Sequence, residues 1–379
     1  MSITENIKTT VSLNIKNVIG WKTRRKIVVF SVDDYGNVRL HSKAARDKMF
    51  AAGLKPIVRY DVYDALETAD DLTALYDTLS AVKDKNGQHA VFTAFTICAN
   101  IDFEKMMDTG YSNYYYEELP VTFSKLQGYG NVWPLWKEGI QKRLLLPQFH
   151  GREHLNIKIL MDNLHKKNND FFISLSNRSY AAIGNLLPAE MDYTAAFDFQ
   201  DAAENSNLKT VAAEGLDIFK KLFGYTATHF NPCGSFGYSH VLEPVLKNGG
   251  IKFIDTARFK KEHLGGDAYG PRVFNYTGKK NECGQTLLVR NCVFEPTEDR
   301  GIDWVSFCMK QIDAAFRWNQ PAVISSHRVN FCGAIEPSNR QQGISSLKEL
   351  LGKITRQWPD VEFMSANELG ELISVSVIN

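Results

Sequence analysis

Short apolar runs alternate with segments of helical spacing along most of this chain. The runs are rich in β-branched residues, as in Ile27-Val-Val-Phe-Ser-Val32, a composition typical of buried parallel strands. We expect strands over residues 27–32, 56–62, 90–98, 144–149, 227–231, 251–255, 286–294, 322–326 and 361–364. We expect helices over residues 42–52, 70–83 (capped by Asp70 or Asp71), 157–165, 210–223, 239–247, 304–316, 345–357 and 366–373. Strands and helices therefore alternate along the chain, which predicts an α/β protein with a parallel sheet.

The fold class follows from this alternation and from one missing motif. Neither GxGxxG nor GxxxxGK[ST] follows the first expected strand, so a nucleotide-binding open sheet is disfavoured. The pattern favours a TIM-like (β/α) barrel of seven or eight strands. We expect an N-terminal arm over residues 1–25 and a single barrel domain over residues 26–379.

An aromatic-rich insertion interrupts the alternation over about residues 100–142. It holds Tyr114, Tyr115, Tyr116, Trp133 and Trp136. A long segment without regular structure inside a domain is usually a lid or binding loop, so these rings could stack on a sugar. They could also form the core of a small subdomain that caps the barrel. We favour packing, because most aromatic stripes are part of a core.

Composition and charge narrow the class of partner. The 379 residues carry 44 Lys plus Arg against 43 Asp plus Glu, a net charge of +1, which gives no electrostatic reason to bind nucleic acid. No apolar stretch is long enough for a membrane span. The six cysteines form no CxxC pair, which favours free thiols in a reducing cytoplasm over disulfides or a cysteine-ligated zinc. A small or neutral ligand and a cytoplasmic location are expected.

Carboxylates and imidazoles gather where the expected strands end, and barrel active sites lie at that face. Asp33 and Asp34 follow the first strand, His150 and His154 follow the fourth, and His327 follows a late one. On a helical turn, histidines four residues apart share one face and can reach one ion. Two histidines and one carboxylate leave positions open for water and substrate, as in catalytic zinc sites.

Each of these residues also has a structural interpretation. An Asp-Asp pair before glycine is often a plain turn, and a lone histidine after a strand often bonds a backbone carbonyl. Their coincidence at one end of the barrel favours a site. Because neighbouring residues of a strand point in opposite directions, Asp33 and Asp34 can serve one site only if the strand ends or bulges there.

The motifs resemble, in order, those of the polysaccharide deacetylases (NodB homology, carbohydrate esterase family 4), within a barrel superfamily of glycoside hydrolases and deacetylases. The motifs are Asp33-Asp34-Tyr35-Gly36, His150-xxx-His154, Phe230-Asn231-Pro232-Cys233-Gly234, Asp255 and Ile324-Ser-Ser-His327. The resemblance extends over roughly residues 26–376. It implies that Asp33 is the general base, that Asp34, His150 and His154 bind a divalent metal, and that His327 is the general acid.

The resemblance further implies a hydrolase that removes an N- or O-acetyl group from an acetylated amino sugar or polysaccharide. Zinc is the first choice of metal, although nickel, cobalt or iron would accept the same ligands. The family usually has Arg-Pro-Pro-Tyr where this chain has Asn231-Pro232-Cys233-Gly234, so the arginine that orients the base is missing. Arg258, Arg290 or Arg328 could replace it. The first motif is also similar to the Ala-Asp-Asp-Phe-Gly opening of chitooligosaccharide deacetylases.

Two other functions stay open at this point. One is a metal-independent barrel glycoside hydrolase that pairs Asp33 or Asp34 with a second carboxylate such as Glu295. The other is a catalytically inactive deacetylase-like protein that binds a glycan. Metal content distinguishes the glycoside hydrolase from a deacetylase. Turnover of an acetylated sugar distinguishes the inactive glycan-binding protein from a deacetylase.

Overall fold

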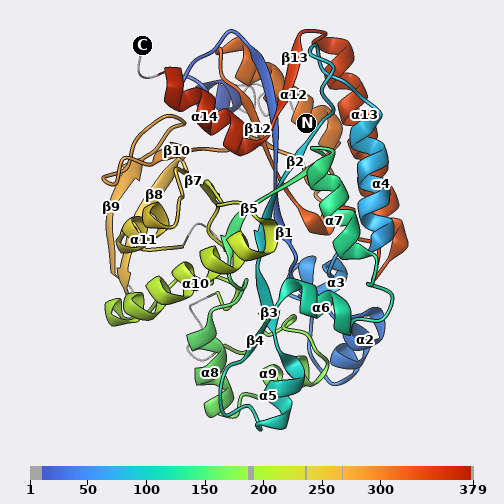
Figure 1. Cartoon of the computed structure of the whole chain (residues 1–379), viewed down its shortest axis with the longest axis vertical. Helices are drawn as coiled ribbons and strands as arrows, with labels where there is room; N and C mark the ends of the chain where they lie inside the picture. Colours follow the sequence, from blue (N-terminus) through green and yellow to red (C-terminus); the bar gives the residue numbers. More distant parts are fainter. Residues whose placement is uncertain (1–10, 187–191, 235–236, 267, 377–379) are drawn as a thin grey trace.

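The computed structural model describes residues 11–186, 192–234, 237–266 and 268–376. A curved sheet of parallel strands runs through the centre of the molecule, with helices around it (Figure 1). The strands of this sheet are β1 (Lys26–Tyr35), β2 (Phe92–Ile97), β5 (Leu145–Gly151), β6 (His229–Phe230), β7 (Phe253–Asp255), β10 (Thr286–Leu288), β11 (Cys292–Val293), β12 (Ala322–His327) and β13 (Val361–Met364).

The strand order is β10-β7-β6-β5-β2-β1-β12-β11, and β13 pairs with the first half of β1. Every pairing in this sheet is parallel. The curled parallel sheet with flanking helices confirms the predicted α/β class and its (β/α) barrel architecture. Its two edge strands, β10 and β11, follow one another directly in the chain.

Helices cover the outside of the sheet, and α4, α7 and α13 pack together on one side (Figure 1). The helices are α2 (Lys43–Ala51), α3 (Tyr60–Tyr63), α4 (Ala69–Ser80), α5 (Phe103–Asp108), α6 (Leu119–Lys125), α7 (Val132–Gln141), α8 (Ile157–His165), α9 (Asn169–Ser176), α10 (Asn205–Phe223), α11 (Glu243–Asn248), α12 (Trp304–Arg317), α13 (Pro337–Gln357) and α14 (Ala366–Ser376). Two antiparallel hairpins, β3 (Ala99–Ile101) with β4 (Tyr116–Glu118) and β8 (Phe259–Gly265) with β9 (Ala268–Phe274), lie outside the main sheet.

Local sequence explains several helix starts. The Ser42 side chain accepts a hydrogen bond from the backbone N–H of Ala45 and caps α2. Thr68 and Asp71 form a reciprocal capping box at the start of α4. The expected cap at Asp70 or Asp71 is therefore wrong by two or three residues, since Asp71 is the third residue of the helix and not the cap itself.

Two predicted strands differ from the structure. Residues 56–62 were expected to be extended, but Asp61 Oδ2 accepts hydrogen bonds from the N–H groups of Ile57 and Val58, and the chain turns there into α3. The strand expected over 286–294 is divided into β10 and β11, because the first half pairs with β7 and the second with β12. The β8–β9 hairpin has no counterpart among the expected strands.

The aromatic segment is not an irregular loop, because it contains β3, α5, β4, α6 and α7. Trp136 is fully buried, and its indole N–H donates to Glu67 at 3.1 Å. Trp133 packs between Trp136 and Phe223, with ring centroids 6.2 and 5.7 Å away. Trp136 thus belongs to the core and the partly buried Trp133 packs against it, as the packing interpretation expects.

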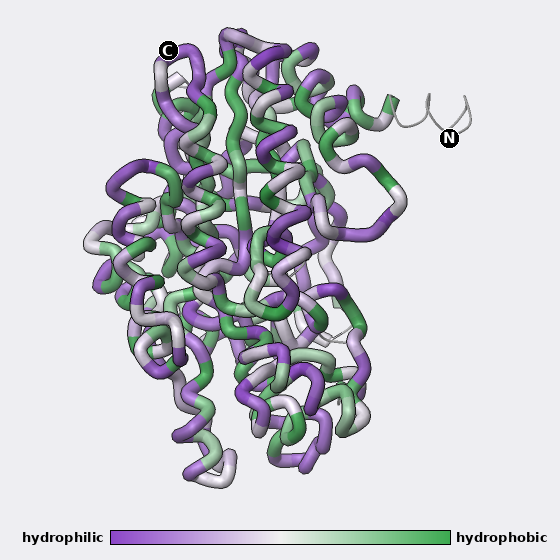
Figure 2. Tube along the Cα trace, turned by 90° about the vertical axis from the view of Figure 1, so that its right-hand side faces the viewer, coloured by the Kyte–Doolittle hydropathy of each residue, from purple (hydrophilic) through white to green (hydrophobic). Residues whose placement is uncertain are grey.

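Apolar residues concentrate on the strands and on the inner faces of the helices. In Figure 2 hydrophobic segments run through the middle of the molecule, while the outer helices mix hydrophobic and hydrophilic positions. One large cluster joins β1, β2 and β12 to α4, α12 and α13 through residues such as Phe30, Phe92 and Ile324. No helix within the described ranges is long and apolar enough to cross a membrane.

Candidate active site

The carboxyl ends of the parallel strands open into one cleft of about 580 Å³. All five site residues predicted from the sequence line this cleft: Asp33, Asp34, His150, His154 and His327. They come from β1, from β5 and the turn after it, and from β12. Their meeting at one end of the sheet follows from the parallel strand order.

Asp33 and Asp34 face different partners because β1 bulges at this point. The pairing of β1 with β2 shifts register between Val32 and Tyr35, and Asp34 has φ of 76°, in the left-handed region that non-glycine residues seldom occupy. Asp33 can therefore bond Arg290 while Asp34 turns toward the two histidines. A bulge is the condition under which adjacent carboxylates can serve one site.

The two histidines and Asp34 form a compact buried set. Asp34 Oδ1 lies 3.4 Å from Nε2 of His150 and 3.1 Å from Nε2 of His154. His154 sits in the turn that follows β5, and His150 is on the strand itself. The expectation of a helical turn is wrong; the strand end and the turn bring the rings together instead, with centroids 5.2 Å apart.

Hydrogen bonding leaves ligand atoms free in this set. Nδ1 of His150 bonds the backbone carbonyl of Asn231 at 2.7 Å, an arrangement that fixes the ring and directs Nε2 toward Asp34. Nε2 of His150 is buried and has no hydrogen-bond partner among the described residues. Burial raises the pKa of Asp34, but the two histidines outweigh burial and hold that pKa well below its usual value. An anionic carboxylate and a free imidazole nitrogen fit a divalent metal.

Arg290 is the arginine that reaches Asp33. Its Nη1 and Nη2 donate to Oδ2 and Oδ1 of Asp33 at 2.7 and 2.8 Å. Its Nε donates to Asp255 at 2.7 Å, and Asp255 also bonds Nε2 of His229 at 2.8 Å. A buried chain of charged groups thus fixes the plane of the Asp33 carboxylate.

The other two candidate arginines are engaged elsewhere. Arg328 is fully buried and pairs with Asp64 and Glu67 at 2.7 and 2.9 Å. Arg258 lies over the ring of Phe274, 6.0 Å from its centroid. The sequence contains one signal that favours Arg290 over the other two arginines. Arg290 lies in the middle of the apolar run 286–294, where a charged residue in a continuous strand would be unusual.

His327 stands next to Asp33 on the neighbouring strand. The two residues are partners in the β1–β12 register, and His327 Nε2 lies 3.8 Å from Asp33 Oδ2. On the other side of the ring, Nδ1 bonds Glu295 Oε1 at 2.7 Å. Burial lowers the pKa of His327, but Glu295 and the two aspartates outweigh it and raise that pKa to about 9.

Glu295 is held in place by two further groups. Its Oε2 accepts hydrogen bonds from Arg59 and from Asn330, the latter at 2.7 Å. Burial raises the pKa of Glu295, yet the nearby His327 and Arg59 lower it overall. The sequence points to Glu295 only as a possible glycosidase carboxylate; its pairing with His327 depends on the contact between β12 and the segment after β11.

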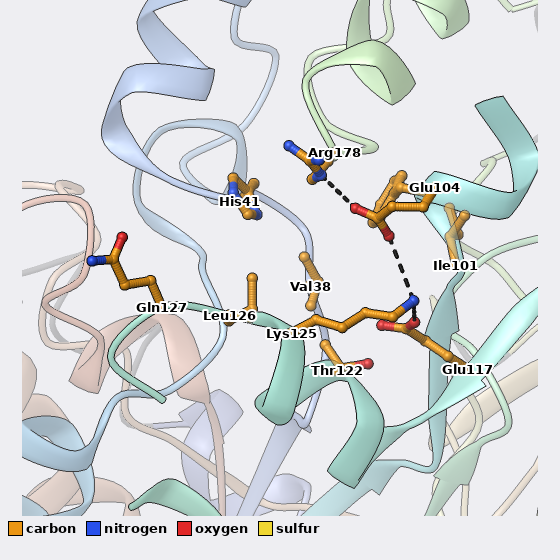
Figure 3. Close-up of a pocket in the computed structure, with 11 residues that line it drawn as sticks. Val38, His41, Ile101, Glu104, Glu117, Thr122, Lys125, Leu126, Gln127 and Arg178 are labelled. Carbon is orange, nitrogen blue, oxygen red and sulfur yellow. Dashed lines mark hydrogen bonds and ion pairs between the residues drawn. The ribbon is translucent and has the colours of Figure 1, made fainter. Parts of the chain in front are cut away.

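A second cavity of about 260 Å³ lies between α5 and α6. Lys125 pairs there with Glu117 and Glu104, and Arg178 bonds Glu104 at 2.6 Å (Figure 3). Lys125 also lies 3.3 Å from Oδ1 of Asp102. Asp102, Glu104 and Glu117 lie close enough together to suit a cation, but the Lys125 ammonium already occupies the space among them. Each of these carboxylates thus already has a cationic partner in the chain.

No family model and no curated protein matches the sequence. Several solved structures align over most of the chain, three of which are as follows. A protein assigned as a polysaccharide deacetylase of Mycobacterium smegmatis is 10% identical, with 94% of this chain and 93% of that chain covered and a TM-score of 0.47. One assigned as a glycoside hydrolase/deacetylase of Parabacteroides distasonis is 10% identical, with coverage of 92% and 72% and a TM-score of 0.49.

The third, assigned as a polysaccharide deacetylase of Pseudomonas aeruginosa PAO1, is 9% identical, with coverage of 92% and 91% and a TM-score of 0.44. Similarity at this level concerns the fold alone, so the chemistry must be argued from the side chains of this cleft.

Proposed function

We propose that this protein is a metal-dependent hydrolase that removes an acetyl group from a carbohydrate, most simply an N-acetyl group from an amino sugar. The observation that carries the proposal is that Asp33 and Asp34, adjacent at the β1 bulge, face different partners. Asp33 is paired to Arg290, while Oδ1 of Asp34 lies 3.4 and 3.1 Å from Nε2 of His150 and Nε2 of His154. One carboxylate is thereby available as a base and the other as a ligand.

Asp34, His150 and His154 would hold the metal. The bond from Nδ1–H of His150 to the carbonyl of Asn231 leaves Nε2 unprotonated and able to bind a metal. The anionic Asp34 would balance part of the cation's charge. A divalent ion bound there would lower the pKa of a bound water to about 7 and polarise the acyl carbonyl. Imidazole and carboxylate donors make zinc our first choice.

Asp33 would accept the proton of the attacking water. Arg290 holds both of its oxygens and so aims the carboxylate, which lets the proton transfer occur from a fixed position. The protonated ring of His327 would then donate a proton to the leaving nitrogen or oxygen, since its pKa of about 9 keeps it charged at neutral pH. Glu295 orients this ring through Nδ1 and leaves Nε2 facing the cleft.

The metal-independent glycosidase is disfavoured by the environment of Glu295. A glycosidase needs one carboxylic acid that stays protonated near neutral pH. The pKa of Glu295 is lowered, and its oxygens are engaged by His327, Arg59 and Asn330. It would therefore remain an anion with its acceptor sites filled.

The experiment is an acetate-release assay on acetylated amino sugars and their oligomers, with protein purified without chelator and analysed for metal. We expect turnover that is lost after chelation and in Asp33→Asn, and retained in Asp217→Asn, a matched change at an exposed position of α10. Binding of the sugars without acetate release in metal-loaded protein would contradict the proposal and favour an inactive glycan-binding protein.

A further inference from the structure

A buried cysteine lies against the proposed metal ligands. Cys233 is fully buried, and its Sγ, one nitrogen of His150 and one of His154 all lie within 4.8 Å of one another. The thiol donates to the carbonyl of His150 at 2.9 Å and is 3.8 Å from the carbonyl of Glu153. Within the described residues, both of these contacts are to backbone oxygens of the segment that carries the two histidines.

A second observation points to a ligand in the same place. His150 is 2% exposed and His154 is 8% exposed. Nε2 of His150 and Nδ1 of His154 are buried and have no hydrogen-bond partner among the described residues. Leaving two buried imidazole nitrogens without hydrogen-bond partners is costly. A cation that accepts nitrogen and sulfur donors would remove that cost.

The backbone around Cys233 makes room for its sulfur. Gly151 has no side chain, and a Cβ there would come 3.2 Å from Cys233 Sγ. Gly234 has φ of +60°, and a Cβ there would lie 2.8 Å from Ala195 Cα, so the residue after the cysteine must be small for the loop to pack. The two glycines let the loop after β6 bring its thiol close to the turn after β5.

We propose that Cys233 is a soft fourth ligand of the metal held by Asp34, His150 and His154. This inference rests on the proposed metal site and adds a donor that the motif resemblance does not imply. On binding, the S–H bond breaks, the sulfur keeps the electron pair and bonds the ion, and the proton passes to solvent. A thiolate donor favours zinc, cobalt and nickel over magnesium and calcium, which would make this site more selective than a set of only nitrogen and oxygen ligands.

Cobalt(II) titration of the full chain tests the inference. Visible bands report cobalt bound to nitrogen and oxygen donors, whereas a near-ultraviolet sulfur-to-cobalt band appears only with a thiolate ligand. We expect both in the unmodified protein and in Cys283→Ser, a control at a half-buried cysteine. In Cys233→Ser we expect the visible bands without the near-ultraviolet band, and cobalt binding weaker by at least about tenfold, a loss that removal of an outer partner can already cause.

The outcomes separate this inference from the proposed function. Visible bands without a near-ultraviolet band in the unmodified protein, or a band that persists in Cys233→Ser, would overturn the role of Cys233 and leave the metal site intact. Absence of any cobalt band would overturn the metal site itself, and Cys233 with it. X-ray absorption of the zinc-loaded, unmodified protein needs no variant: one sulfur at about 2.3 Å is expected, and a shell of only nitrogen and oxygen would contradict it.

Discussion

Arg290 donates hydrogen bonds to both carboxylate oxygens of Asp33, at 2.7 and 2.8 Å. It lies between β10 and β11, the two edge strands of the sheet. The chain crosses there from one end of the curled sheet to the other, and the arginine side chain enters the cleft beside the end of β1. The position that the motif resemblance assigns to Asn231 is thereby filled from a different strand end.

The first prediction concerns this pair. Arg290→Gln should lower kcat by about 10²–10⁴-fold, the usual contribution of a positioned base, while metal content stays unchanged because no proposed ligand contacts Arg290. Steady-state kinetics and elemental analysis check both points. Arg258→Gln, a change of the same type outside the Asp33 contact, should leave kcat near its original value; equal losses in the two variants would refute the assignment.

Asp33 and Asp34 should separate by their effects on metal. Asp34→Asn removes the anionic donor next to His150 and His154, so we expect loss of bound metal together with activity. Asp33→Asn should retain the metal and lose turnover, because the carboxylate that faces Arg290 is not a ligand in our assignment. Metal retained in Asp34→Asn and lost in Asp33→Asn would exchange the two roles.

His327 should act in catalysis and not in metal binding. His327→Ala removes the proton donor, and we expect kcat to fall by about 10²–10⁴-fold with metal content preserved. A leaving group that departs without protonation, such as an aryl acetate, should suffer a smaller loss than an amide. Full activity toward an acetylated amino sugar in this variant would leave the acid unidentified.

The pH profile should depend on Glu295. Burial lowers the pKa of His327, but Glu295 is the first of the groups that raise it, to about 9 overall. Glu295→Gln removes that negative charge, so the pKa should fall toward the ordinary value of about 6.5. Because the acid must be protonated, activity falls as pH rises through this pKa, and the alkaline limb of kcat/KM should move to lower pH.

Glu298→Gln is the matched control for that profile, because Glu298 pairs with the exposed Arg300. Its alkaline limb should coincide with that of the unmodified protein. An unchanged limb in Glu295→Gln would show that another group sets the alkaline side of the profile.

A stability prediction follows from the buried Arg328. It pairs with Asp64 and Glu67, all three being at most 1% exposed at the side chain. Arg328→Met would leave two buried carboxylates without their cation and should lower the free energy of unfolding by about 3–5 kcal/mol. Arg317→Met, which breaks an exposed i, i+4 pair with Asp313, should cost about 0.5 kcal/mol or less. Denaturant unfolding of both variants measures the contrast.

Much of the local structure could be predicted from the sequence. The expected helix over 157–165 and strand over 361–364 agree with α8 and β13 to the residue, because their apolar spacing and short-range caps depend on neighbours in the chain. The (β/α) order, the cleft at the strand ends and the gathering of Asp33, Asp34, His150, His154 and His327 follow from the same alternation, since parallel strands must all end at one face.

Other features were decided only by the tertiary structure. Residues 286–294 have the composition of one strand, yet their two halves pair with opposite edges of the sheet, and Arg290 reaches Asp33 only because of that crossing. The left-handed backbone of Asp34 is likewise a product of its pairing with β2. Local pattern thus determined which elements form and at which end their functional residues lie, whereas partners such as Arg290 and Glu295 depend on contacts between segments far apart in the chain, whose register no local spacing encodes.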